Sequence, residues 1–198
     1  MIFKTYRFGH IYGAEFHVYP GILAVPTAMI LVYDNAAEFA SHFAIVLGIF
    51  ASIFAHEMGH LLTARRFGVR CKRLVMGLVA AHVAIHDDDF EYIPARHSVA
   101  ISLGGPVANG VLFHVAWLWN VTYGYTEFGH WMADLNFCFF VVNLLPFIPY
   151  TDGFNVMVSG LLWKIYGGSS TYAQRKMERE YEELCKKMDE LKSKLETA

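Results

Sequence analysis

Charged side chains are scarce in this sequence of 198 residues, and neither sign of charge predominates. Asp, Glu, Lys and Arg make up 17% of the chain, with 18 acidic residues, 16 basic residues and a formal net charge of −2. This balance provides no extended basic surface, so we expect no nucleic-acid partner. The three cysteines, Cys71, Cys138 and Cys185, are odd in number and far apart, which excludes a disulfide framework.

Hydrophobic residues are abundant instead, at 55% of the chain, which is typical of a membrane protein. A helix that crosses a hydrocarbon core of roughly 30 Å needs about 20 mostly apolar residues. Residues 39–62, 98–119 and 131–150 meet this requirement, and residues 18–33 form a shorter fourth candidate that two prolines interrupt. Residues 154–166 are too short to span and are expected to form a half-helix or an interfacial segment. We therefore predict a membrane all-α fold, a bundle of about four transmembrane helices.

The distribution of Lys and Arg predicts the orientation of these segments. Counted along the chain, the four apolar segments are residues 18–33, 39–62, 98–119 and 131–150. Basic residues collect before the first segment, after the second and after the fourth, whereas residues 122–129 between the third and the fourth contain none. Because cytosolic loops are enriched in Lys and Arg, this pattern predicts a multi-pass integral membrane protein with both termini in the cytosol.

Two further regions differ in pattern from the apolar segments. Residues 68–97 are more polar and strand-like, which predicts a small β-hairpin-like excursion at the cytosolic face or the membrane interface, and residues 5–19 could add another strand. Residues 169–198 carry apolar side chains at 4-3-4-3 spacing among many charges, which predicts an amphipathic heptad helix. We divide the chain into a core, residues 1–168, and this C-terminal helix. The helix either joins copies into a homo-oligomer or docks on its own chain.

Residues 55–60 read A-H-E-M-G-H inside the second apolar segment. On a helix, His56 and His60 share one face and can present two imidazoles to one metal ion, while Glu57 reaches the adjacent water. A charge near the bilayer centre costs about 2.5–3.5 kcal/mol, so Glu57 needs a compensating partner, and Zn²⁺ is the simplest. A polar helix–helix contact or a pore-lining cluster is the alternative.

A catalytic zinc ion keeps three protein ligands and one open position, so two histidines require a third ligand. Asp152 is the best candidate, because Pro146 and Pro149 break the fourth apolar segment near the cytosolic end and Gly153 permits a tight backbone. An ordinary surface turn is the alternative for this Asp-Gly pair. Other candidates, expected to be interfacial or hydrogen-bonded residues rather than ligands, are His82, His86, His130 and Asp134.

Three sequence blocks together resemble the site-2 protease family of intramembrane zinc metalloproteases. Residues 56–60 resemble its H-E-x-G-H motif, residues 105–109 its G-P-x-x-N block, and residues 143–153 its N-x-x-P-x-x-P-x-D-G block, in the same order. The departure is one extra residue, since both Tyr150 and Thr151 stand between the second proline and the aspartate. The resemblance implies zinc binding by His56, His60 and Asp152, general-base catalysis by Glu57, and lining of the site near the substrate backbone by Asn109 and Asn143.

The leading functional hypothesis is therefore a zinc metalloendopeptidase that cuts membrane-spanning or membrane-associated protein substrates near the cytosolic face of a lipid bilayer, in regulated intramembrane proteolysis. A catalytically inactive membrane regulator of the same fold is the alternative, for which the irregular spacing before Asp152 is the main support. A metal-handling or transport protein is the third hypothesis, and the scatter of its histidines over several segments speaks against it.

Overall fold

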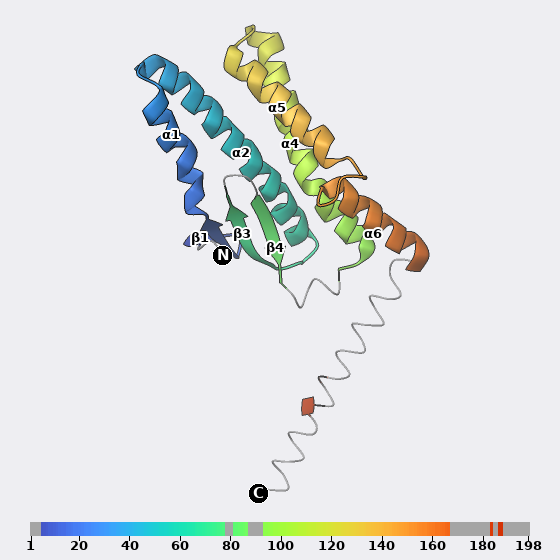
Figure 1. The fold of residues 1–198 in the computed structure, drawn as a ribbon. Coiled ribbons are helices and arrows are strands. Elements are labelled where there is room, and N and C mark those ends of the chain that lie inside the picture. Colours follow the sequence, from blue (N-terminus) through green and yellow to red (C-terminus); the bar gives the residue numbers. More distant parts are fainter. Residues whose placement is uncertain (1–4, 78–80, 87–92, 167–182, 184–185, 188–198) are drawn as a thin grey trace, which may run out of the picture.

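The structure, a computed structural model, describes residues 5–77, 81–86, 93–166, 183, 186 and 187, and it is mostly helical with one small sheet (Figure 1). Helices α2 (Ala36–Arg66) and α4 (Ala95–Tyr123) have 31 and 29 residues and are long and apolar enough to cross a membrane. They contain the predicted apolar segments 39–62 and 98–119. The Asn35 side chain caps α2 by accepting a hydrogen bond from the Ala37 N–H at 2.9 Å, and the basic Arg65 and Arg66 end it.

The other two predicted spans are shorter as helices than the sequence indicates. Residues 18–33 form the end of a strand, a 3-10 turn η1 (Pro20–Leu23) and helix α1 (Ala24–Val32). Helix α5 (Glu127–Asn143) has 17 residues, whereas we expected 131–150. It starts earlier because the Thr126 hydroxyl caps it, accepting from the Gly129 N–H at 3.1 Å. It ends earlier because Pro146 disfavours helical backbone in the residue before it.

A four-stranded sheet packs against the C-terminal half of α2 (Figure 1). Its order is β1 (Tyr6–Ile11), β2 (Ala14–Val18), β3 (Cys71–Met76) and β4 (Ala81–Ile85), which confirms the strands expected within residues 5–19 and 68–97. The pairs β1–β2 and β3–β4 are antiparallel, and β2–β3 is parallel. Leu61 of α2 is buried against Leu74 and Met76 of β3, so the sheet and the H-E-x-G-H helix share one apolar core.

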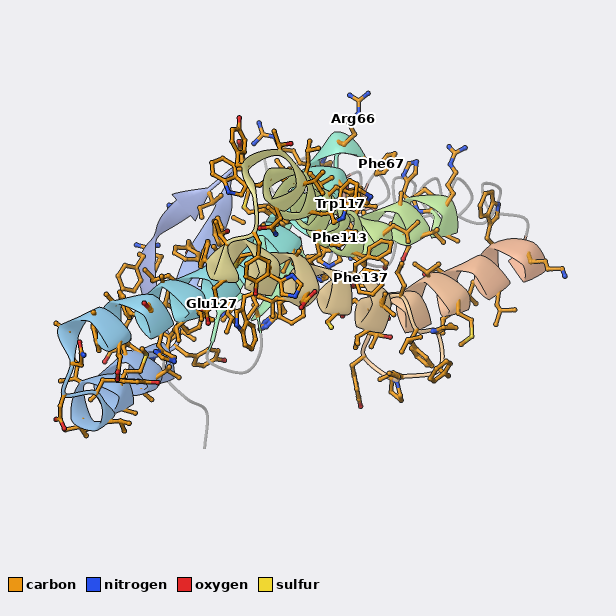
Figure 2. All side chains as sticks on the ribbon, turned by 90° about the horizontal axis from the view of Figure 1, so that it is seen from above. Arg66, Phe67, Phe113, Trp117, Glu127 and Phe137 are labelled. Atoms are coloured by element: carbon orange, nitrogen blue, oxygen red, sulfur yellow. The ribbon has the colours of Figure 1, made fainter. Side chains whose placement is uncertain are left out.

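Close packing between α2 and α4 depends on two glycines. A Cβ atom on Gly59 would collide with the backbone carbonyl of Gly104, and one on Gly104 would lie 2.5 Å from the Gly59 oxygen. Small residues at such a crossing let two backbones approach closely, as is common between membrane helices. Helix α5 packs along α4 and also contacts α2, and the rings of Phe113 in α4 and Phe137 in α5 lie 5.3 Å apart (Figure 2).

Helix α6 (Asp152–Tyr166) runs beside the N-terminal half of α4 (Figure 1). The hydroxyls of Ser98 in α4 and Ser159 in α6 lie 2.9 Å apart. The predicted C-terminal heptad helix, residues 169–198, lies outside the described residues apart from 183, 186 and 187. The fold thus places the start of α6 against α4, at the depth where α4 crosses α2.

Candidate metal centre

His56 and His60 lie one turn apart on α2 and face the same way, as their spacing predicts. Their Nε2 atoms are 3.1 Å apart, and both side chains are largely buried. The neighbouring α4 approaches so closely that a Cβ atom on Gly105 would collide with both imidazole rings. Gly105 therefore makes room for the two rings at the helix crossing.

Asp152, the first residue of α6, completes a group of three. Its carboxylate oxygens lie 3.0 Å from His56 Nε2 and 3.2 Å from His60 Nε2. Within the part of the chain that the structure describes, these three form the cluster of His, Cys, Asp and Glu side chains that could hold a metal ion, with ligand atoms all within 4.8 Å. The structure thus brings together the three residues for which the sequence suggested zinc binding.

The extra residue before Asp152 is taken up by the backbone at Tyr150. Tyr150 has φ 70°, in the left-handed region, and its side chain is 98% exposed. The next residue anchors the turn, because the Thr151 hydroxyl lies 2.8 Å from the carbonyl oxygens of Leu145 and Ile148 and accepts the Phe154 N–H at 3.3 Å. The irregular spacing therefore leaves Asp152 facing the histidines.

The two imidazole nitrogens are spaced for one metal ion. Ligand atoms about 2.0–2.1 Å from a tetrahedral zinc ion lie about 3.3 Å from one another, and the Nε2 atoms of His56 and His60 are 3.1 Å apart. The Asp152 carboxylate lies beside both, with Oδ2 3.0 Å from His56 Nε2 and Oδ1 3.2 Å from His60 Nε2. Two imidazoles and one carboxylate are also a donor set that zinc accepts, with the fourth position left open.

Each histidine is oriented through its second ring nitrogen. His60 Nδ1 lies 2.7 Å from the Ile101 carbonyl oxygen in α4, and His56 Nδ1 lies 2.5 Å from Asn109 Oδ1. An Nδ1–H that donates to oxygen leaves the Nε2 lone pair for a metal, which is the usual arrangement around metal-binding histidines. Asn109, which the resemblance places near the substrate backbone, is fully buried beside His56 and is not among the residues that line the cavity.

A cavity of about 690 Å³ opens beside the cluster and reaches from α2 and α4 to β4 and α6. Glu57 lines it, is only 7% exposed, and accepts a hydrogen bond from the backbone N–H of Val83 in β4. Asn143 also lines the cavity, and its amide N–H donates to the Phe139 carbonyl at 3.0 Å. The potential base and the potential ligands thus face one water-accessible space.

The competing candidates are not part of this cluster. His130 and Asp134 form an exposed pair on α5, with 3.3 Å between Nε2 and Oδ2. His82 lines the cavity from β4 but is exposed and is not part of the three-residue cluster. His86 lies in a second, smaller cavity at the sheet end of α2.

Two residues of the centre escaped the sequence analysis. Ser52 and Asn136 are both completely buried and connect to Asn109 by hydrogen bonds. A signal for them exists: Ser52 precedes His56 by four residues and so shares its helical face, and Asn136 is a strongly polar residue inside an apolar segment.

Comparisons with known proteins agree with this geometry. Residues 44–126 match Peptidase family M50. A protein of Synechocystis sp. named as a zinc metalloprotease is 26% identical over 178 residues, covering 83% of this chain and 46% of the relative. The zinc metalloprotease Rip3 of Mycobacterium tuberculosis is 25% identical, covering 61% of this chain and 31% of its own length. The chain thus spans less than half the length of these relatives.

A solved structure shares the fold. The site-2 protease of Methanocaldococcus jannaschii superimposes with a TM-score of 0.61 at 20% sequence identity, covering 86% of this chain and 77% of that one. Residues 44–126 of this chain thus match peptidase family M50, and the chain has the fold of that site-2 protease.

Proposed function

We propose that this chain is a zinc metalloendopeptidase that hydrolyses peptide bonds of membrane-spanning or membrane-associated proteins near the cytosolic face of a bilayer, in regulated intramembrane proteolysis. The observation that carries the proposal is the convergence of His56, His60 and Asp152 with ligand atoms within 4.8 Å of one another, and with Glu57 beside them on one cavity. Zinc held there supplies Lewis-acid chemistry, because it acidifies water and polarises a peptide carbonyl.

The residues of the chain bind the ion, transfer the proton and position the substrate. His56, His60 and Asp152 hold the ion, and the Glu57 carboxylate accepts a proton from the attacking water and returns it to the leaving amine. Asn143 lines the same cavity and offers its amide to the substrate backbone. Asn109 keeps His56 oriented from behind.

A transmembrane substrate must lose helical structure before cleavage, because a helix shields its carbonyl groups in internal hydrogen bonds. Strand β4 can hold the extended segment. It is an edge strand of the sheet, and Ala81, Val83 and Ile85 line the cavity. Pairing with an exposed edge supplies backbone hydrogen bonds to a peptide of any sequence.

The proposal includes a membrane arrangement. Residues 1–168 form the protease core, in which α2 and α4 cross the bilayer, α1 with η1 and α5 complete four spans, and both termini lie in the cytosol. Residues 169–198, which lie outside the described residues apart from 183, 186 and 187, are the part of the chain through which we propose that copies associate.

The test is cleavage of a single-span model substrate by the purified protein in lipid nanodiscs. Glu57→Gln removes the proton acceptor but no zinc ligand, so we expect activity to fall by about 10²–10⁴-fold with zinc content unchanged. Glu38→Gln is the matched control, since Glu38 lies in the first turn of the same helix, far from the cluster, and should leave both quantities unchanged. Undiminished cleavage by Glu57→Gln would contradict the proposal.

A further inference from the structure

A chain of hydrogen bonds runs from His56 into the interior of the helix bundle. Asn109 of α4 accepts from His56 Nδ1 and donates through Nδ2 to Asn136 Oδ1 at 2.9 Å and to the Ser52 carbonyl at 3.3 Å. Asn136 of α5 donates through its own Nδ2 to Ser52 Oγ at 3.0 Å and to the Met132 carbonyl at 2.8 Å. These hydrogen bonds thus join the three helices α2, α4 and α5, and the series starts and ends on α2.

This chain of bonds has a direction. An amide that turned over at Asn109 would aim its NH₂ at the His56 ring and its oxygen at two acceptors, Asn136 Oδ1 and the Ser52 carbonyl. The upstream contacts therefore hold Oδ1 of Asn109 toward His56. An acceptor in that position requires a proton on Nδ1, so Nε2, which faces Asp152 and His60, is the ring nitrogen through which His56 would bind a metal ion.

The site cannot replace these bonds with water. Ser52, Asn109 and Asn136 have 0% exposed surface, and the described residues include no buried side-chain polar atom without a hydrogen-bond partner. A buried amide that loses its partner pays the desolvation penalty of about 1–3 kcal/mol. The side chains of Ser52, Asn109 and Asn136 therefore hold one another in place, and through Asn109 they also hold the His56 ring.

We propose that Asn136 and Ser52 are positioning residues of the metal centre, which act through Asn109 to set the tautomer and the ring orientation of His56. This inference rests on the proposed function, in which His56 binds zinc through Nε2. It assigns a role in metal binding to two residues on helix faces that never meet the substrate cavity.

Two measurements test the proposal, one of them without metal. The first is the zinc dissociation constant of the whole protein in nanodiscs, obtained by competition with a chelator. The second is the ¹⁵N NMR spectrum of the histidine rings in the zinc-free protein, read at Nδ1 of His56 alone, because Asp152 faces Nε2 and can hold a proton there when no metal is bound. The wild type should show His56 as Nδ1–H, assigned by its loss in His56→Gln.

Asn136→Leu keeps the side-chain volume but removes both amide atoms. We expect it to weaken zinc binding by about 10-fold or more, within the range seen for groups that orient metal ligands, and to give a mixture of His56 tautomers. Asn120→Leu is the control, because Asn120 also forms side-chain hydrogen bonds in α4 but contacts Thr126 and not this network. Unchanged affinity and unchanged tautomer in a folded Asn136→Leu protein would overturn the proposal.

Ser52→Ala is the milder variant, which keeps the inference testable if Asn136→Leu does not fold. It removes one acceptor of Asn136, so zinc affinity should fall by a few-fold. If the two residues act in one chain, adding Ser52→Ala to Asn136→Leu should cause no further loss, whereas two independent packing effects would add and contradict the proposal. A wild type that binds no zinc yet shows the Nδ1–H tautomer would refute the protease function and leave the positioning role supported.

Discussion

Asp152 reaches the histidines from the first residue of a helix, so its position depends on how that helix begins. Thr151 determines this start: its hydroxyl contacts two carbonyl oxygens of the preceding turn and accepts the Phe154 N–H. A hydroxyl that caps a helix in this way stabilises it by about 1 kcal/mol. Here the same bonds also hold the turn in which Tyr150 takes up the extra residue.

Thr151→Val should therefore damage the metal centre without touching a ligand. Valine has nearly the same shape but no hydroxyl, so we expect a loss of about 1 kcal/mol in the free energy of unfolding and weaker zinc binding. Thr151→Ser retains the hydroxyl and should behave nearly as the wild type. Thermal unfolding and chelator competition on the three proteins decide the matter, and a loss in the serine variant as large as or larger than that in the valine variant would contradict the role of the hydroxyl.

Substitution of the carboxylate itself gives a second test. Asp152→Asn replaces a charged oxygen ligand by a neutral amide, so the purified protein should lose its stoichiometric zinc. Asp134→Asn removes a carboxylate that only pairs with the exposed His130, and it should retain full zinc content. Full zinc in Asp152→Asn, measured by elemental analysis, would mean that another group completes the coordination.

The residue scale also shows what the sequence can reveal about the site. His56, Glu57 and His60 were predictable because their relation is local: four residues on a helix return to the same face. Asp152 is 92 residues beyond His60, and its approach depends on a left-handed residue and a cap that no periodicity encodes. Asn109 was found by its motif, but only the packing of three helices revealed that it serves His56 from behind.

At the scale of elements, the centre depends on how closely α2 and α4 approach. Gly59 stands between the two histidines and touches the backbone of Gly104, and Ile101 of α4 supplies the carbonyl that orients His60. The distance between α2 and α4 at their crossing therefore determines how the two histidines are placed. Any side chain at the crossing must separate the helices and move His60 away from its partner.

Gly59→Val is the corresponding prediction. The new side chain meets backbone atoms, which cannot rotate away, so we expect destabilisation of about 1–3 kcal/mol together with weakened zinc binding. Gly160→Ala is the control, since nothing lies within 4 Å of a Cβ atom there and the helix should gain up to about 1 kcal/mol. Thermal unfolding in detergent and zinc affinity, both measured on the two variants, distinguish a destabilised Gly59→Val protein from an unaffected Gly160→Ala protein.

Element boundaries were less predictable than element types. Apolar runs identified α2 and α4, and alternation identified the strands, because both signals extend over many residues. The end of α5 was misplaced because an apolar run continues to Tyr150, while Pro146 and Pro149 prevent helix there. Hydrophobicity indicates only that a segment is buried in lipid or protein, whereas residues that cannot adopt helical backbone, such as proline, determine where the helix ends.

At the scale of the whole molecule, the distribution of charged and apolar residues predicts a membrane topology. Arg66 at the end of α2 is exposed and points away from the helices (Figure 2), and it belongs to a basic cluster. The connection between α4 and α5 contains Tyr125, which is 72% exposed, and no Lys or Arg. If basic loops remain in the cytosol, these two positions lie on opposite faces of the membrane.

Cysteine labelling tests this arrangement in a background where Cys71, Cys138 and Cys185 are replaced by serine. In intact cells, a membrane-impermeant maleimide should label Tyr125→Cys at once and Arg66→Cys only after permeabilisation, because in the proposed arrangement helix α4 crosses the bilayer between them. Zinc content of both variants should equal that of the background protein, since neither residue contacts the cluster. Labelling of both positions from the same side would mean that α4 does not span, and the site would then open to a different compartment from the one the basic residues indicate.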